Sequence, residues 1–410
     1  MPNSLRDTDL IPLHAWLIEA GTNDVAAEPL FDGFCGRLVA AGVPIARGFL
    51  SIAGLHPLRR AYSLTWHDGR IVEATDFGHA TMATPVWHNS PFRHMLETKT
   101  RRLHRRLVGD DPVLDFEVLR EFRDAGMSEW LALIYGFGWS AAPETTNQFG
   151  IVLSWATSKA VGRGNGWSAL ELAAIEELSG TLALAIKGNI APAAAHDLLA
   201  AYLGSDAADR VSAGQVQRGS VSRIAAAILC GDVRGFTNFA EETAPEEVTR
   251  RLNGIFDCVG DPVRAAGGEI LKFLGDGVLV VFLPPDGANV AVVTPAALAA
   301  AREILGRVEA LNATETAAGN PALILNIALH AGEVTYGNIG TADRLDFTVI
   351  GPAVNEAARL EGLCKELGTP ILISKSFMEA AQGVRDQLLS VGRHPLRGVR
   401  EPQDVFTICT

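Results

Sequence analysis

The feature that most constrains the fold is a pair of apolar runs, each joined to a glycine and an aspartate. Residues 224–229 form the first run, which has the composition of a buried strand and leads to Gly231 and Asp232. In the second, residues 275–277 read Gly-Asp-Gly and separate two further apolar runs, as a tight hairpin would. The pattern therefore predicts a sheet in which Asp232 and Asp276 lie on neighbouring strands.

Two carboxylates on neighbouring strands form a binding site for divalent cations. Mg²⁺ takes a few carboxylate oxygens and leaves its other positions to water and phosphate, and a pair of such ions activates an attacking oxygen while stabilising a leaving one. The chemistry that this pattern indicates is phosphoryl or nucleotidyl transfer. The ordinary alternative is that Asp232 caps a helix and Asp276 fills a hairpin loop, and either motif alone leaves that alternative open.

A third motif, residues 346–360, favours the metal site over the ordinary roles of the two aspartates. A strand that ends near Gly351 runs into a helix, where Asn355 and Arg359 lie four residues apart and therefore share one face. With the two aspartate strings in the same order, residues 218–409 resemble the catalytic domain of the class III nucleotidyl cyclases, the adenylate and guanylate cyclases. The fold expected for these residues is α+β, on the ferredoxin-like βαββαβ plan.

The expected elements of this domain follow from the apolar patterns. They are a strand at 224–229, a helix at 245–266, a hairpin around Asp276, a helix that ends near Leu311, and strands that begin near Leu323 and Leu345. Residues 369–410 would form the C-terminal subdomain that the resemblance implies.

The resemblance implies roles for the metal-binding and catalytic positions. Asp232 and Asp276 match the family's metal aspartates, which hold two Mg²⁺ or Mn²⁺ ions per active site, with the Val233 carbonyl as a further ligand. Asn355 and Arg359 match the pair that positions the ribose and stabilises the transition state at the α-phosphate. They would act by charge-assisted hydrogen bonding in a site closed to water.

The resemblance also implies how the base and the phosphates are bound. Lys272 and Thr348 match the base-reading pair, and both residue types point to adenine. Animal enzymes grip the terminal phosphates with a lysine where this chain has Arg397, which keeps the charge and adds a phosphate-matching fork. Further substrate contacts are expected at Phe236, Thr237 and Arg344.

Each of these positions also has an ordinary explanation. Lys272 within an apolar strand would blunt a sheet edge, Thr348 would be a β-branched strand residue, and Arg359 would be a solvated helix residue. Taken together, the matches would require several coincidences in the right order.

The activity that the resemblance implies is adenylate cyclase, in which the 3′-hydroxyl of ATP attacks the α-phosphate and releases pyrophosphate and 3′,5′-cyclic AMP. In this family the metal aspartates come from one subunit, whereas the base-reading pair and the Asn355–Arg359 pair come from the other. A chain that carries both sets is therefore expected to form a homodimer.

Three alternatives to this activity make different demands on the sequence. A guanylate cyclase would be expected to have an acidic residue in place of Lys272, and residues 267–269 do not continue the signature of a diguanylate cyclase. A catalytically silent module that binds nucleotide as a regulator typically lacks a metal aspartate or the asparagine–arginine pair, all of which this chain keeps.

The length and charge of the whole chain restrict its partners. Its 410 residues allow two or three domains, and a net charge of −12 argues against a protein that holds nucleic acid along a basic face. The five cysteines lack paired spacing, which favours the reducing cytoplasm over a disulfide framework. With neither a signal peptide nor an apolar run of membrane-spanning length, we expect a soluble cytoplasmic protein without a membrane partner.

Aromatic residues mark a separate N-terminal domain, since all seven tryptophans lie between Trp16 and Trp167. We predict a domain at residues 1–192, a helical linker at 193–217 and the catalytic domain at 218–410. Strands within 44–66, 130–139 and 149–157 and an amphipathic helix at 171–186 indicate a second α+β fold, which is similar to a GAF-type sensor domain. Such a domain implies a small-molecule effector of unknown identity.

Two groups of side chains in this domain are candidate ligand contacts. Aromatic residues in strands are more often core than pocket, and histidines at scattered spacing are more often structural than bound to haem or metal. The residues concerned are Trp66, Trp87, Trp130 and Trp155, and His56, His67 and His88.

Overall fold

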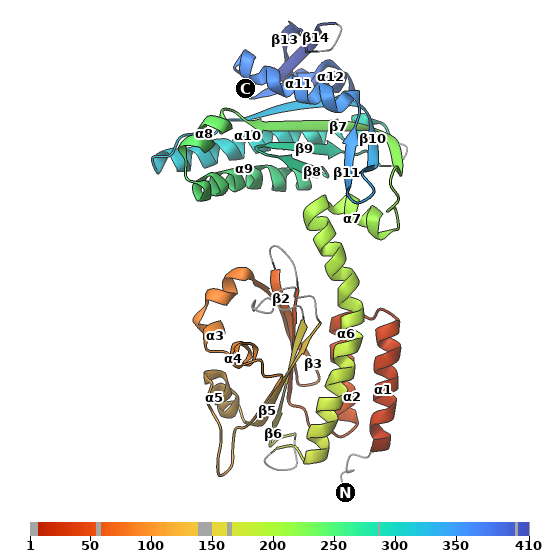
Figure 1. Ribbon diagram of the computed structural model, residues 1–410, viewed down its shortest axis with the longest axis vertical. Coiled ribbons are helices and arrows are strands. Elements are labelled where there is room, and N and C mark those ends of the chain that lie inside the picture. The colour runs from red at the N-terminus through yellow and green to blue at the C-terminus, as the bar shows by residue number, and fades with distance from the viewer. Residues whose placement is uncertain are drawn as a thin grey trace. The chain divides into compact units, whose positions relative to one another are not determined.

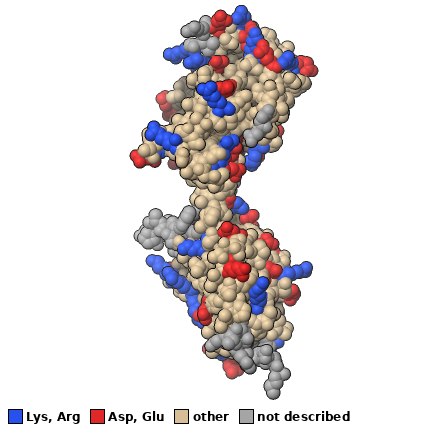
Figure 2. All heavy atoms as spheres, turned by 90° about the vertical axis from the view of Figure 1, so that its right-hand side faces the viewer, with Lys and Arg blue, Asp and Glu red and all other residues tan. Residues whose placement is uncertain are grey.

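The computed structural model describes residues 7–54, 59–137, 150–161, 166–285, 288–397 and 401–409. The chain divides into two compact units, Met1–Ala201 and Tyr202–Thr410. On the face drawn in Figure 2, acidic and basic side chains are interspersed over each unit, so neither sign of charge dominates that face. Among the helices in the described ranges, none is both long enough and apolar enough to cross a membrane.

The N-terminal unit is built on a six-stranded sheet with strand order β3-β2-β1-β6-β5-β4. All neighbouring strands in it pair antiparallel. The strands are β1 (Arg47–Ala53), β2 (Arg59–His67), β3 (Arg70–Gly78), β4 (Arg102–Arg106), β5 (Met127–Gly136) and β6 (Gly150–Ser158). Strands were expected within 44–66, 130–139 and 149–157, and the parts of those ranges at 55–58 and 138–149 lie outside the described residues.

Helices cover both faces of this sheet (Figure 1). One face packs against α1 (Asp7–Thr22), α2 (Ala27–Ala40) and α6 (Ala169–Leu203); the other lies under η1 (His79–Ala83), α3 (Pro85–His88), α4 (Pro91–Glu97) and α5 (Glu117–Asp124). In the first core, Trp155 is fully buried against Phe31 and Phe34, and its indole N–H donates to Ser179 Oγ at 3.0 Å. The amphipathic helix expected at 171–186 continues through Pro192 into the helical linker expected at 193–217, as one helix, α6.

Three of the four candidate tryptophans lie in the cores, as expected for aromatic residues in strands. Trp66, Trp130 and Trp155 are at most 3% exposed, whereas Trp87 is half-buried. Of the candidate histidines, His67 lies 2.9 Å from its neighbour Asp68, and His56 is outside the described residues.

The C-terminal unit contains an eight-stranded sheet with β7 (Val221–Val233) near its centre. The strand order is β13-β14-β12-β10-β7-β9-β8, and β11 pairs with β10 outside this path. The other strands are β8 (Glu269–Leu274), β9 (Gly277–Phe282), β10 (Leu325–Gly340), β11 (Leu345–Ile350), β12 (Ile371–Ser374), β13 (Leu388–His394) and β14 (Gln403–Ile408). The predicted order of strand, helix, hairpin, helix and two strands is the order observed, although β7 extends beyond 224–229 at both ends.

Both faces of this sheet are covered, which explains why β7 reads as an uninterrupted apolar run. Ala227 and Leu229 enter one core with α9 and α10, and the alternate residue Ile228 enters another with α7 and α11. The helices are α7 (Ser205–Ser212), α8 (Phe236–Glu242), α9 (Pro245–Ala265), η2 (Val290–Val292), α10 (Thr294–Ala317), α11 (Pro352–Leu367), α12 (Lys375–Ala380) and η3 (Arg385–Gln387).

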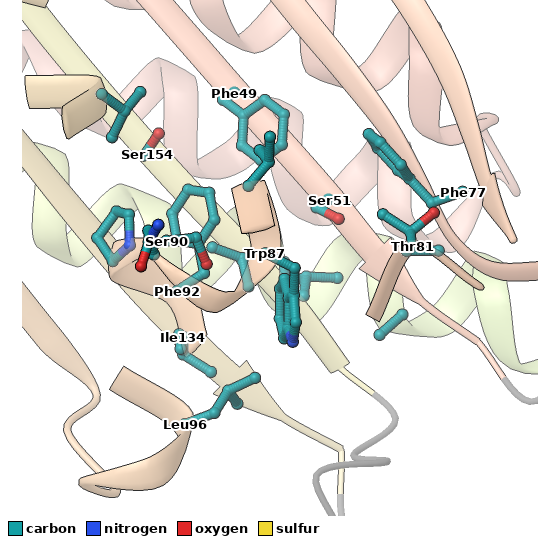
Figure 3. Close-up of a pocket in the computed structure, with 18 of the residues that line it drawn as sticks. Phe49, Ser51, Phe77, Thr81, Trp87, Ser90, Phe92, Leu96, Ile134 and Ser154 are labelled. Atoms are coloured by element: carbon teal, nitrogen blue, oxygen red, sulfur yellow. The ribbon is translucent and has the colours of Figure 1, made fainter. Parts of the chain in front are cut away.

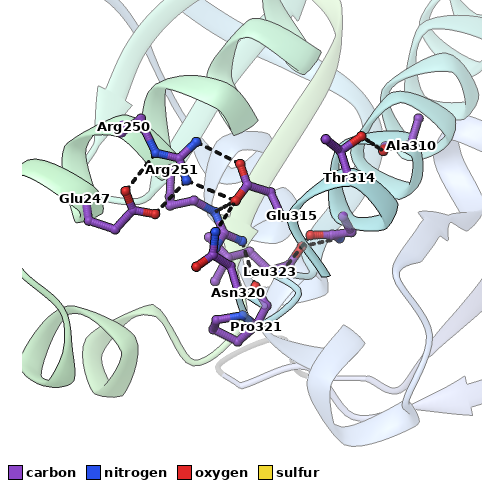
Figure 4. A network of polar contacts seen from close by, with 10 residues as sticks. Glu247, Arg250, Arg251, Ala310, Thr314, Glu315, Asn320, Pro321 and Leu323 are labelled. Atoms are coloured by element: carbon purple, nitrogen blue, oxygen red, sulfur yellow. Dashed lines mark hydrogen bonds and ion pairs between the residues drawn. The ribbon is translucent and has the colours of Figure 1, made fainter. Parts of the chain in front are cut away.

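A charged network joins α9 to the end of α10 (Figure 4). Glu315 is 6% exposed, and its two carboxylate oxygens accept hydrogen bonds from Arg250 at 2.8 and 2.9 Å. Asn320 donates to the same carboxylate at 2.7 Å. The hydrogen bonds from Arg250, followed by the one from Asn320, lower the pKa of Glu315 to about 2. The network thus keeps a buried carboxylate ionised and fixes the two helices to each other.

The segment expected to be a linker, residues 193–217, is divided between the two units. Within the C-terminal unit, α7 carries the fully buried Ala207 into the core that it shares with α11. The Tyr336 hydroxyl donates to the Asp206 carboxylate at 2.6 Å, and the Glu269 carboxylate accepts from Ser205 Oγ at 3.0 Å. Residues 205–212 are therefore an integral helix of the C-terminal unit.

Candidate active site

The end of β7 and the β8–β9 hairpin bring the two predicted aspartates together. Asp232 is the penultimate residue of β7, and β9 pairs antiparallel with β7 alongside it. The hairpin loop has two residues, of which Gly275 adopts a φ of +67°, a conformation that glycine adopts without steric cost. A Cβ atom on Gly277 would lie 3.2 Å from Asp232 Oδ1, so this second glycine lets the hairpin approach the strand end closely.

Negative charge accumulates where these strands meet. Partial burial, followed by the nearby charge of Asp276, raises the pKa of Asp232 to about 6. Glu361 on α11 is a third carboxylate in this region; burial, and then the charge of Asp232, raise its pKa to about 7. Glu361 was not predicted from the sequence, although it directly follows the motif at residues 346–360.

Polar side chains link the end of β7 to β10 and α11. Arg234 donates to Asn326 Oδ1 at 3.0 Å and to the Cys364 carbonyl at 3.3 Å. Asn326 also hydrogen-bonds to Glu361, which lowers the pKa of that carboxyl against the larger effect of burial. These contacts fix the position of Glu361 relative to Asp232, and none of the three side chains was predicted from the sequence.

The donor set at Asp232 and Asp276 fits a Mg²⁺-type cation. The raised pKa of Asp232 indicates negative charge that its protein neighbours do not neutralise, and a divalent cation would neutralise it. In the described part of the chain, no group of three or more His, Cys, Asp and Glu residues is arranged to hold a metal. Mg²⁺ is commonly bound through one or two carboxylates, with water and substrate phosphate at its other positions.

The strands β8 and β11 bring the predicted base-reading residues close together. Lys272 on β8 forms an ion pair with Asp346 on β11. Thr348 follows two residues later and therefore lies on the same side of β11. Its side chain is buried, and its hydroxyl has no hydrogen-bond partner among the described residues. The observed partner of Lys272 is Asp346, to which sequence reasoning assigned no role.

The remaining predicted residues lie at the surface of the unit. Asn355 and Arg359 are exposed along one face of α11, and Arg344, Arg397 and Thr237 are also exposed. Within the ranges that the structure describes, no hydrogen bond or ion pair joins Asn355 or Arg359 to either aspartate. Phe236 is half-buried, with its ring centroid 6.1 Å from that of Phe239.

Residues 221–409 match the family model described as the adenylate and guanylate cyclase catalytic domain. The adenylate cyclase of Anabaena cylindrica is 36% identical over 167 residues, which are 40% of this chain and 32% of that protein. Adenylate cyclase 1 of Rhizobium meliloti is 35% identical over 145 residues, 35% of this chain and 21% of that protein. The crystal structure of the adenylyl cyclase CyaB from P. aeruginosa is 27% identical, with a TM-score of 0.42 over 47% of this chain and 96% of that one.

The chain thus spans about a third or less of the two curated relatives named above. The part that matches is the C-terminal unit, which contains the aspartate pair and the Lys272 region. Residues 221–409 are therefore similar in sequence to adenylate and guanylate cyclase catalytic domains.

Proposed function

We propose that this protein is an adenylate cyclase that converts ATP to 3′,5′-cyclic AMP and pyrophosphate. The observation that carries the proposal is the Asp232–Asp276 pair at the end of β7, within a domain of the cyclase family. The identity of 35–36% to proteins named adenylate cyclase supports the same activity. The domain boundaries proposed from the sequence are 1–192, 193–217 and 218–410, with the cyclase fold on the ferredoxin-like plan.

Each charged or polar group in the site has a separate task in this mechanism. Asp232 and Asp276, with the Val233 carbonyl, would hold two Mg²⁺ or Mn²⁺ ions, which supply Lewis-acid activation of the 3′-hydroxyl and of the phosphates. Asp232 must be ionised for this task, which its raised pKa of about 6 permits at neutral pH but not at acidic pH. Asn355 orients the ribose, while Arg359 stabilises the charge that develops at the α-phosphate. Arg397 and Arg344 contact the remaining phosphates, and Phe236 and Thr237 are further substrate contacts.

The base is bound between β8 and β11 in this proposal. The ammonium group of Lys272 and the buried hydroxyl of Thr348, which has no protein partner among the described residues, offer hydrogen bonds to the edge of adenine. One observation favours a second candidate, guanylate cyclase. The Asp346 carboxylate beside Lys272 is an acceptor of the kind that the N–H groups of guanine require.

Homodimer formation is supported by the surface around this site. Phe273 and Leu274 on β8 and Ile350 on β11 are 49%, 60% and 49% exposed, and such exposure of several large apolar side chains in one region marks an interaction surface. A second copy of the chain would cover them, and it would bring its own Asn355 and Arg359 to the Asp232–Asp276 pair. The alternative from another functional class is a regulatory module that binds nucleotide without catalysis.

The N-terminal unit is proposed to be a GAF-like sensor domain that regulates the cyclase in the cytoplasm. Its six-stranded antiparallel sheet with helices on both faces supports the sensor fold. A small-molecule effector is proposed because this unit also contains a large cavity, described below.

Nucleotide turnover by the purified full-length protein tests the proposed function. ATP and GTP are compared with Mg²⁺ and with Mn²⁺, and the cyclic product is identified by mass spectrometry. We expect cyclic AMP from ATP with a kcat/KM at least about tenfold above that for GTP, because mismatched bases leave buried polar groups unpaired. A preference for GTP would favour the second candidate, and an absence of cyclic product under all four conditions would contradict catalysis.

A further inference from the structure

The N-terminal unit encloses a cavity of about 480 Å³ between its sheet and the helices α3–α5 (Figure 3). This volume lies within the range of about 300–1,000 Å³ that is typical of small-molecule sites. The wall on the sheet side includes Phe49 on β1 and Ile134 on β5, and the opposite wall includes Trp87 on α3 and Phe92 on α4. Most of the lining is apolar, so the body of a ligand that fills the cavity must be apolar as well.

The arrangement of aromatic rings favours a flat ligand. Phe49 and Phe92 are stacked, with ring centroids 5.5 Å apart and an interplanar angle of 6°. Phe92 in turn lies 6.2 Å from Trp130, and Trp87 extends into the same space in Figure 3. Planar aromatic molecules match such surfaces by offset stacking and edge contacts.

One charged side chain lies against this apolar lining. The Arg47 guanidinium is 5.0 Å from the ring centroid of Phe122 and 5.5 Å from that of Phe49, and it donates to Thr65 Oγ1 at 3.4 Å. None of the ion pairs formed between described residues involves Arg47, and Glu73 acts on it only at longer range. Arg47 is half-buried, and this burial lowers its pKa.

The other charged residues that line the cavity do not form an ion pair with Arg47. Glu117 and Glu121 are exposed where they line it, and Arg60 adds a second positive charge. The neutral polar groups in the lining include hydroxyls and an amide, from Ser51, Thr81, Asn89, Ser90 and Ser154. A desolvated arginine without a carboxylate in contact is stabilised by an anion that also fits the apolar space.

We propose that this cavity binds a planar aromatic carboxylate, whose ring system lies among Phe49, Trp87 and Phe92 and whose carboxylate pairs with Arg47. The inference deepens the proposed sensor role of the N-terminal unit by naming the class of its ligand. Binding itself does not depend on cyclase activity, so the two can fail separately.

The test compares 2-naphthoate with its neutral analogue 2-naphthamide on the full-length protein. Binding is measured by calorimetry and by the change in tryptophan emission, because Trp87 and Trp130 line the cavity. We expect naphthoate to bind at least about tenfold more tightly than naphthamide, since charge-assisted hydrogen bonds are markedly stronger than neutral ones. Equal affinities for the two probes, or no binding of naphthoate at millimolar concentration, would overturn the proposal.

Variants separate the contribution of charge from that of shape. Arg47→Met should abolish the preference for naphthoate and leave naphthamide binding within about twofold, and Trp87→Ala should weaken both probes. Arg47→Gln removes the charge but can still donate to Thr65, and it serves if the methionine variant does not fold. The matched control is Arg37→Met, because the Arg37 guanidinium also lies over a ring, 3.9 Å from the Trp16 centroid, but outside the cavity. An unchanged preference in folded Arg47 variants would assign the charge recognition elsewhere and overturn the proposal.

Turnover of ATP is measured separately, with and without saturating naphthoate. A changed rate of cyclic AMP production supports the sensor role of the N-terminal unit. An unchanged rate with naphthoate bound contradicts that role and leaves the binding site as inferred.

Discussion

The two units of this protein each contain charge that their own residues do not neutralise, but the sign and the surroundings differ. In the C-terminal unit, Asp232, Asp276 and Glu361 gather at the end of β7, where burial and mutual repulsion raise the pKa of Asp232 and Glu361. In the N-terminal unit, Arg47 lies among aromatic rings at a cavity wall. The Asp232–Asp276 pair suits a divalent cation, and the surroundings of Arg47 suit an organic anion.

The comparison also shows two ways of building a site. The carboxylate site consists of a few polar residues at strand ends, with glycines that allow close approach of the backbone. The cavity is lined mostly by apolar side chains from several elements, with the arginines Arg47 and Arg60 among them. A single substitution should therefore eliminate the function of the first site, whereas the second should lose affinity by steps.

The largest effect is expected from removal of either aspartate. Asp232→Ala or Asp276→Ala should lower kcat by at least about a hundredfold, the scale of losing a main electrostatic stabiliser. The assay is cyclic AMP production with Mn²⁺ present, and Asp257→Ala on the exposed face of α9 is the matched control. Near-normal activity of a folded aspartate variant would break the assignment of this site.

A smaller change is expected in base preference. Lys272→Glu should lower the ratio of kcat/KM for ATP to that for GTP by at least about tenfold, because the new carboxylate accepts hydrogen bonds from guanine and repels the neighbouring Asp346. Lys365→Glu, at an exposed position of α11, controls for the change of net charge. If the ratio is the same in Lys272→Glu and wild type, Lys272 does not read the base.

The carboxylate site should make metal stabilisation depend on pH. The folded-state pKa of Asp232 is about 6, above its ordinary value of 3.8, so without metal this group costs increasing stability as the pH rises from about 4 to 6. Cation binding requires the ionised form and therefore strengthens over the same window. Mn²⁺ at a hundred times its Kd at pH 7 should raise Tm at that pH by roughly 5–10 °C. The same Mn²⁺ concentration should raise Tm by less at pH 5.

This pH dependence is measured by differential scanning fluorimetry with and without Mn²⁺. Asp276→Asn removes the repulsion on Asp232 and one cation ligand, so it should raise the Tm of the metal-free protein at pH 7 and reduce the gain from Mn²⁺. Equal stabilisation by Mn²⁺ at pH 5 and pH 7 in the wild type would show that Asp232 is not part of the metal-binding site.

The smallest effect is expected where α7 packs on the C-terminal unit. Tyr336→Phe removes the hydrogen bond to the Asp206 carboxylate and should cost about 1.5–3 kcal/mol, the range for bonds to charged groups. Tyr202→Phe is the control, because Tyr202 is 78% exposed. Unfolding in urea measures both variants, and equal stabilities would indicate that the α7 contact adds little.

Local patterns in the sequence predicted the elements that depend on neighbours along the chain. The apolar run of β7, the Gly-Asp-Gly hairpin and the stripe of α9 gave the order of elements in the C-terminal unit. They predicted that Asp232 and Asp276 lie on neighbouring strands; in the structure Asp232 is on β7, and Asp276 is in the hairpin loop that leads into the neighbouring strand β9. The assignment of Trp66 and Trp155 to the core is confirmed as well, because large aromatic side chains on covered strands have few other places to go.

What the sequence could not predict depends on contacts between distant segments. Glu361 belongs to the carboxylate group only because α11 packs beside β7, and Asp346 reaches Lys272 only because β11 lies near β8. The prediction of a linker at 193–217 did not anticipate the packing of α7, because Ala207 and Asp206 make their contacts with distant segments such as Tyr336 on β10. The cavity beside Trp87 was hidden for the same reason, because its walls come from separate strands and helices.

The most direct test of the central claim, a cyclase whose active site combines groups from two subunits, is a mixing experiment. Asp232→Ala and Asn355→Ala homodimers should each be nearly inactive, because every site lacks one essential group. After subunit exchange, about half of the dimers are mixed and each has one intact site of two, so cyclic AMP production should recover to roughly a quarter of the wild-type rate. Differently tagged chains confirm that mixed dimers have formed. Confirmed mixed dimers that remain as inactive as their parents would contradict the account.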